Sequence, residues 1–129
     1  MGKRLYLRVN DLISKNDLPT VTSETNVKDV IIEISEKRLG ATAVIDDNKI
    51  KGMITDGDIR RMLEKHHDIS SLTAKDIMTA NPKTLDADAM AIDALNTLEK
   101  HGITQILVVN KEAYVGIIHL HDLIKEGIF

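Results

Sequence analysis

The chain has 129 residues, of which 43% are hydrophobic and 29% charged, the balance of an ordinary globular protein. A net charge of −3 and only three aromatic residues (two Tyr, one Phe) argue against nucleic acid as a partner. No apolar run approaches the roughly 20 residues of a membrane span or forms a secretory signal, so we predict no membrane partner. Cysteine is absent, which excludes thiol catalysis and disulfides and fits a cytoplasmic location.

The first half of the chain predicts the order helix, short strand, helix, strand, strand, helix. VNDLI (9–13) is the first helix, and the second has apolar residues at the spacing i, i+3, i+4, i+7 from Val27. Ala41–Ile45 and the apolar run that opens at Gly52 are two strands joined by a tight polar turn. A helix is expected to begin near Asp58, after the second of these strands.

The same order recurs after a shift of 64 residues. Gly52 aligns with Gly116 and Asp58 with Asp122, and the apolar helix face returns in register as Ala91, Ala94, Leu95 and Leu98. We predict two units, 1–72 with a remnant of an N-terminal linker and 73–129. One such unit cannot bury a core alone. The prediction is therefore an α/β fold of two units related by pseudo-twofold symmetry, each a small mixed sheet with flanking helices.

Thr55 and Asp58 are the first candidate site, because a strand ends and a helix begins between them. A carboxylate accepts the two hydrogen bonds of a ribose diol, whereas a hydroxyl and free backbone N–H groups suit a phosphate. Arg60 and Arg61 could add a charge-assisted contact to phosphate. The alternatives stay open: Asp58 could serve only to cap the helix, and both arginines could be solvated helix residues.

GIIHLHDLI (116–124) raises a second question, because His119 and His121 alternate before Asp122. A metal site would need a third ligand, and the other histidines belong to other elements. We therefore predict no metal site. His119 and Asp122 are instead candidates for a second copy of the Thr55 site, with structural histidines as the alternative. A protonated His119 would favour an anionic ligand at lower pH.

Tandem units that end in Gly-apolar-apolar-(Thr/Ser)-x-x-Asp resemble a pair of cystathionine-β-synthase (CBS) domains, a Bateman module. GMITDGDI (52–59) fits closely, and GIIHLHDL (116–123) fits with His119 in the Thr/Ser place. The resemblance implies that the Thr and Asp positions hold nucleotide phosphate and ribose, and that each cleft adds residues of the other unit. By that pattern, the residues joining Thr55 and Asp58 would be Thr84, Ala89, Ile103 and Thr104. Those joining His119 and Asp122 would be Thr20, Thr25, Leu39 and Gly40.

Four longer stretches resemble the C-terminal regulatory part of the arabinose-5-phosphate isomerases, sugar isomerases with a fused CBS pair: KRLYLRVNDLI (3–13), TDGDIRRMLE (55–64), AKDIMTANPKTL (74–85) and IIHLHDLIKEG (117–127). This resemblance implies a regulatory module without catalytic residues, preceded in the full-length protein by a sugar-isomerase domain. It also implies a homodimer or higher homo-oligomer. The expected effector is a nucleotide or nucleotide sugar, with CMP-Kdo (CMP-linked 3-deoxy-manno-octulosonate) or CMP first and AMP or ATP second. No cofactor is expected to be required.

Two other classes of function are alternatives to a regulatory module that binds an effector. A purely structural module would assemble the isomerase oligomer without any ligand. An independent enzyme would show turnover by this chain alone.

Overall fold

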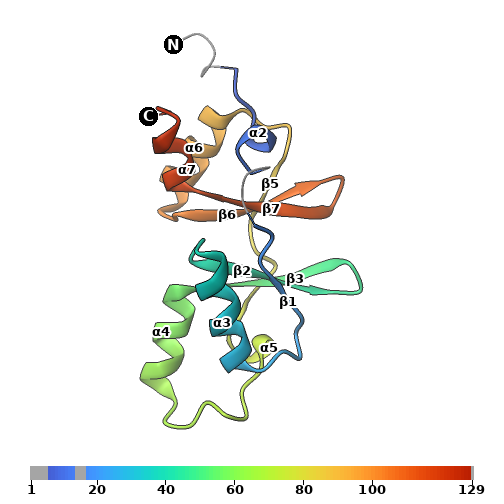
Figure 1. The fold of residues 1–129 in the computed structure, drawn as a ribbon, viewed down its shortest axis with the longest axis vertical. Helices are drawn as coiled ribbons and strands as arrows, with labels where there is room; N and C mark the ends of the chain where they lie inside the picture. The colour runs from blue at the N-terminus through green and yellow to red at the C-terminus, as the bar shows by residue number, and fades with distance from the viewer. Residues whose placement is uncertain (1–5, 14–16, 129) are drawn as a thin grey trace. The chain divides into compact units, whose positions relative to one another are not determined.

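The computed structural model describes residues 6–13 and 17–128, and within these residues it forms six helices and seven strands (Figure 1). The chain divides into two compact units. The continuous unit runs from Pro19 to Pro82. The composite unit joins the described residues up to Leu18 with those from Lys83 onward. No helix in the described part of the chain is long and apolar enough to cross a membrane.

The continuous unit contains a four-stranded sheet in the order β1-β2-β3-β4, in which β1 and β2 are parallel and the other pairs antiparallel. Its helices lie on one face of that sheet (Figure 1). The elements are β1 (Thr20–Val21), α3 (Val27–Lys37), β2 (Ala41–Asp46), β3 (Lys49–Thr55), α4 (Asp56–Lys65), α5 (Ala74–Ile77) and β4 (Thr79–Ala80).

The composite unit repeats this plan with a three-stranded sheet, in which β5 is parallel and β7 antiparallel to the central β6. Helices again lie on one face (Figure 1). The elements are α2 (Val9–Ile13), β5 (Thr84–Asp86), α6 (Ala91–His101), β6 (Gln105–Asn110), β7 (Ala113–His119) and α7 (Leu120–Lys125). The predicted α/β class, with a small mixed sheet and flanking helices in each of two units, is therefore confirmed, as is the predicted order of elements; only the short strand β4 was not anticipated.

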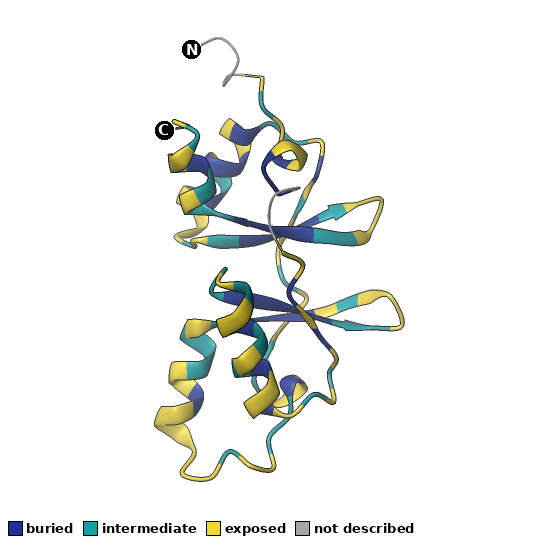
Figure 2. Ribbon diagram, in the orientation of Figure 1, coloured by how far each residue is buried: buried dark blue, intermediate teal, exposed yellow. Residues whose placement is uncertain are grey.

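The repeat extends to details of packing and backbone. Helix α3 buries Val27, Val30 and Ile34, and α6 buries the equivalent residues of its own apolar face. Both hairpins turn through two residues with positive φ, Asp47–Asn48 and Lys111–Glu112, the geometry that suits the twist of two paired strands. Figure 2 shows the two turns exposed and the middle of the strands buried.

The two repeats exchange their leading helices. Helix α2 opens the first repeat, yet its Val9, Leu12 and Ile13 pack into the core of the composite unit. The Val9 N–H donates to the Ala89 carbonyl at 2.8 Å. Conversely, α5 opens the second repeat but belongs to the continuous unit. The division into residues 1–72 and 73–129 follows the sequence repeat and stays a prediction. Contacts between residues instead group the chain into the continuous and composite units.

Candidate functional site

Thr55 is the last residue of β3 and the N-cap of α4. Its backbone N–H and its hydroxyl donate to Asp58 Oδ2 at 2.9 and 3.2 Å, and its hydroxyl accepts from the Asp58 N–H at 3.3 Å. These contacts form a capping box, which satisfies helix-start N–H groups that lack a partner within the helix. The expectation that the helix begins near Asp58 is wrong by about half a turn: α4 begins at Asp56, and Asp58 is its third residue.

Gly40 is brought to the same helix start. Its carbonyl accepts from the Asp56 N–H at 3.0 Å, and the next residue, Ala41, pairs with Thr55 across the sheet. Gly40 has a φ of 70°, which favours glycine where the chain leaves α3 and enters β2. Thr20 lies further along the sheet on β1, where it pairs with Ala43. Of the two candidates Gly40 and Thr20, the fold of the continuous unit therefore places Gly40 beside Thr55.

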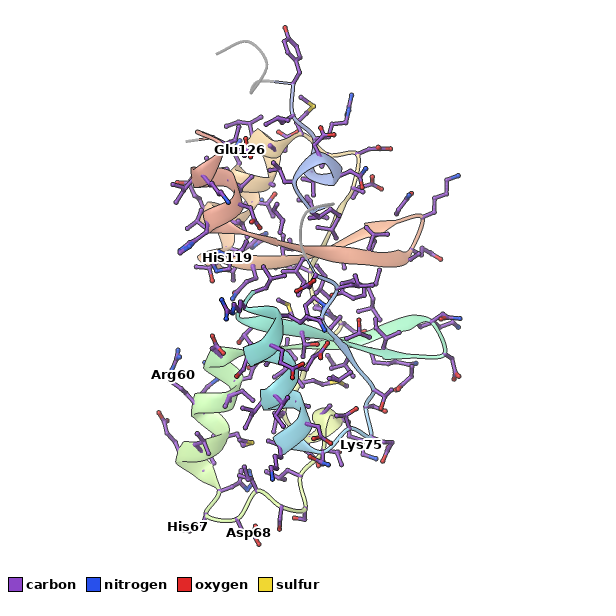
Figure 3. The ribbon with its side chains drawn as sticks, in the orientation of Figure 1. Arg60, His67, Asp68, Lys75, His119 and Glu126 are labelled. Carbon is purple, nitrogen blue, oxygen red and sulfur yellow. The ribbon has the colours of Figure 1, made fainter. Side chains whose placement is uncertain are left out.

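The composite unit repeats this arrangement at the start of α7, where His119 is the N-cap (Figure 3). The His119 N–H donates to Asp122 Oδ2 at 2.9 Å, and the Leu120 N–H donates to the Thr104 carbonyl at 2.8 Å. Thr104 is thus the equivalent of Gly40. Thr84, the equivalent of Thr20, lies on β5 and pairs with Leu107.

Eight of the candidate site residues, four in each unit, therefore form two equivalent sets. The set of the continuous unit is Thr20, Gly40, Thr55 and Asp58; that of the composite unit is Thr84, Thr104, His119 and Asp122. The expected clefts, each combining residues of both units, stay a prediction.

The two histidines are not alternate residues of one strand. His119 ends β7, whereas His121 lies in the first turn of α7 and donates its N–H to His119 Nδ1 at 2.9 Å. Their rings meet edge to face with centroids 4.6 Å apart. Because Nδ1 accepts a hydrogen bond, a neutral His119 carries its proton on Nε2, where it can donate to a ligand. Nowhere in the described chain do three His, Cys, Asp or Glu side chains gather as a metal site would require.

The pKa of His119 is lowered from its ordinary value of 6.5, first by burial and then by His121, while Asp122 opposes both effects. The unfolded chain therefore takes up this proton more readily than the folded chain. The contribution of neutral His119 to folding stability is therefore fully present above pH 6.5. It is lost as the pH falls from 6.5 through the pKa of His119 in the folded chain. Protonation of Nδ1 would also break its hydrogen bond with the His121 N–H.

We expect His119→Thr to remove this part of the pH dependence of stability, because Thr does not titrate in this range. The Thr hydroxyl should still cap α7, as the Thr55 hydroxyl caps α4. Urea unfolding measured between about pH 7.5 and pH 5 tests this. His101, which is exposed, also has a lowered pKa, caused by slight desolvation and then by Lys83 and Lys100. His101 is present in both the native chain and the His119→Thr variant, so the difference between their pH dependences of stability isolates the effect of His119. Equal pH dependence in the two proteins would contradict the assignment.

A Thr-x-x-Asp helix start also occurs outside the candidate site in this protein. Thr73 and Asp76 form the same capping box at α5, with the Thr73 N–H 2.8 Å from Asp76 Oδ2. Asp29 pairs in a similar way with Asn26, the N-cap of α3. What distinguishes Asp58 is its place after a buried strand and its ion pair with Arg61, whose Nη2 lies 2.7 Å from Asp58 Oδ1. Sequence reasoning missed this pair, although an i, i+3 spacing of opposite charges on a helix indicates it.

Comparison with known proteins agrees with the doubled architecture. The profile of the CBS domain family matches residues 9–65 and again 74–128. Arabinose 5-phosphate isomerase KdsD of Yersinia pestis is 35% identical over 130 residues, 99% of this chain and 40% of that protein. KdsD of Francisella tularensis is 41% identical over 127 residues, 97% of this chain and 39% of that protein. The chain spans about two fifths of the length of these relatives.

Solved structures share the fold at low sequence identity. The CBS domain protein NE2398 has a TM-score of 0.86 and 19% identity, covering 95% of this chain and 98% of that one. PAE2072 from Pyrobaculum aerophilum, complexed with AMP, has a TM-score of 0.81 and 20% identity, covering 91% and 90%. The CBS pair of MJ0100, in complex with 5′-methylthioadenosine and S-adenosyl-L-methionine, has a TM-score of 0.81 and 23% identity, covering 93% and 94%. The two profile matches, with which the repeated order of elements agrees, show that the chain belongs to the CBS domain family and carries its domain twice.

Proposed function

We propose that this CBS pair is a regulatory module that binds a nucleotide or nucleotide sugar and thereby tunes an arabinose-5-phosphate isomerase domain of the same protein. The observation that carries the proposal is the strand-to-helix site of Thr55 and Asp58, where a partly buried carboxylate and a hydroxyl meet at a helix start. A carboxylate there suits ribose hydroxyls, and a helix start suits phosphate. His119 and Asp122 offer a second site of the same construction.

The relatives and structural neighbours support this choice of ligand and enzyme. The sequence relatives are arabinose 5-phosphate isomerases, and two neighbours of the same fold were solved with AMP or with adenosine derivatives. CMP-Kdo is the effector we test first, because the resemblance to arabinose-5-phosphate isomerases implies a product that is used to make Kdo, and CMP-Kdo is the activated end product of that route; adenine nucleotides come second. The module contributes regulation rather than catalysis, in a homodimer or higher homo-oligomer.

Titration calorimetry of the chain with CMP-Kdo, CMP, AMP and ATP in turn tests the proposal. Preferential binding of a CMP compound would support sensing of the end product. Preference for AMP or ATP would make the module a sensor of adenine nucleotides. Absence of heat and of any thermal shift with all four compounds would refute ligand binding and favour a purely structural module. A bound effector can act on the enzyme only if its affinity differs between two states of the assembly.

A further inference from the structure

Arg61 lies folded back over the first turn of its own helix. Its Nη2 donates to Asp58 Oδ1 at 2.7 Å, and the two side chains differ sharply in exposure: that of Arg61 is 63% exposed and that of Asp58 is 11% exposed. The cation is therefore open to solvent and to an approaching anion, whereas the carboxylate behind it is mostly covered.

The guanidinium occupies an acceptor position that a ligand would need. Asp58 Oδ2 already accepts from the Thr55 N–H and the Thr55 hydroxyl, and Arg61 takes Oδ1. An ionised carboxylate offers about four lone-pair positions, so these three donors leave little capacity for the two hydroxyls of a ribose. A ribose can bind Asp58 well only if Arg61 moves.

Gly57 provides the space in which the guanidinium lies. A Cβ atom at Gly57 would stand 3.3 Å from Arg61 Nη1 and 3.4 Å from Nη2. In the second repeat, the equivalent positions hold His121 and Lys125. The arginine folded over a glycine is thus a property of the Thr55 site.

We propose that Arg61 is a specificity-determining residue that makes the Thr55 site selective for 5′-phosphorylated nucleosides over nucleosides. This inference rests on the proposed function. Exposed ion pairs are weak, so the guanidinium can leave Asp58 at small cost. A phosphate attracts it through paired charge-assisted hydrogen bonds, and its departure frees Oδ1 for a ribose hydroxyl. A nucleoside has no phosphate to attract Arg61, and it must compete with the guanidinium for Oδ1.

The test compares nucleotide and nucleoside affinities, with AMP against adenosine and CMP against cytidine, on the whole chain by calorimetry. We expect the nucleotide to bind the native chain at least about tenfold more tightly than its nucleoside, the scale of one lost charge-assisted contact. In Arg61→Gln, we expect nucleotide affinity to fall about tenfold and nucleoside affinity to stay or rise, which brings the ratio near one. Lys65→Gln, which removes an exposed positive charge further along α4, is the matched control and should leave the ratio unchanged.

The outcomes separate this inference from the proposed function. If the native chain binds nucleotides and Arg61→Gln keeps the native ratio, the role of Arg61 is refuted while ligand binding stands. An equal loss of nucleotide affinity in Lys65→Gln would mean that any positive charge on α4 has the same effect, and it would also refute the role of Arg61. If the native chain binds neither nucleotide nor nucleoside, the proposed function fails, and the inference fails with it. Far-ultraviolet circular dichroism of both variants verifies that α4 and the fold are retained.

Discussion

Replacing Asp58 by Ala is expected to weaken nucleotide binding by about 10- to 100-fold. The expected loss corresponds to one hydrogen bond to a charged group, worth about 1.5–3 kcal/mol. The variant should also lose about 1 kcal/mol of stability, because the carboxylate belongs to the capping box of α4. Binding and stability must therefore be measured together, by calorimetry and by urea unfolding.

Asp76→Ala is the matched control for this variant. Asp76 occupies the same third helix position as Asp58, and its Oδ2 accepts from the Thr73 N–H and hydroxyl at 2.8 and 3.1 Å. Its removal disturbs a capping box without touching the candidate site, so stability should fall modestly while nucleotide affinity stays at the native value. Native affinity in Asp58→Ala would rule out the ribose role of this carboxylate. A comparable loss of affinity in Asp76→Ala would show that affinity merely follows stability.

Gly52→Ala is expected to cause a large loss of stability for the addition of a single methyl group. A Cβ atom there would stand 2.5 Å from Met78 Sδ and 2.8 Å from the Thr79 carbonyl oxygen. The Met78 side chain can move aside, but the carbonyl belongs to β4, which pairs with β3 at this point. Backbone must therefore shift, and we expect a cost near the upper end of the about 1–3 kcal/mol usual for overpacking.

Gly116→Ala tests the same substitution at the equivalent position of the other unit. The three atoms nearest to its added Cβ all belong to the Ile13 side chain, the closest at 3.3 Å. This side chain can yield, but Gly116 has a φ of 158°, a conformation that L side chains rarely adopt, so the loss expected here comes from strain of β7 itself rather than from a neighbouring strand. Urea unfolding gives the two free energies, and hydrogen exchange of the β3 amides locates the damage. Native exchange protection of the β3 amides in Gly52→Ala would contradict the role assigned to β4.

Much of the fold could be predicted because the sequence pattern of each element occurs twice. The apolar spacing from Val27 returns from Ala91, and the glycine and aspartate that bracket each strand-to-helix junction keep the same offset. Periodicity of this kind reports which face of an element is buried. The candidate residues Thr55 and Asp58 follow from the same junction, although their mutual capping contacts would have followed from the Thr-x-x-Asp spacing itself.

The exchange of leading helices could not be predicted in the same way. VNDLI (9–13) and AKDIM (74–78) are both amphipathic, and nothing in such a pattern states which core receives each helix. That choice is made by contacts between distant residues, such as the antiparallel bridges of Arg8 with Met90 and of Asn26 with Thr73. Hydrophobic periodicity likewise does not predict that the Arg61 side chain lies over Gly57, because this placement depends on a rotamer at an exposed position.

The exchange also sets the order in which the chain can fold as it is synthesised. The continuous unit holds all its residues once Pro82 has been made. Val9, Leu12 and Ile13 have by then long left the ribosome, yet the residues they pack against lie beyond position 83. The Arg8 side chain finds its acceptor, the Asp88 carbonyl, 80 residues later. Domains fold as units during synthesis, and distant contacts form slowly. Residues of α2 are thus made early within this CBS pair and are among the last of the pair to reach their native neighbours.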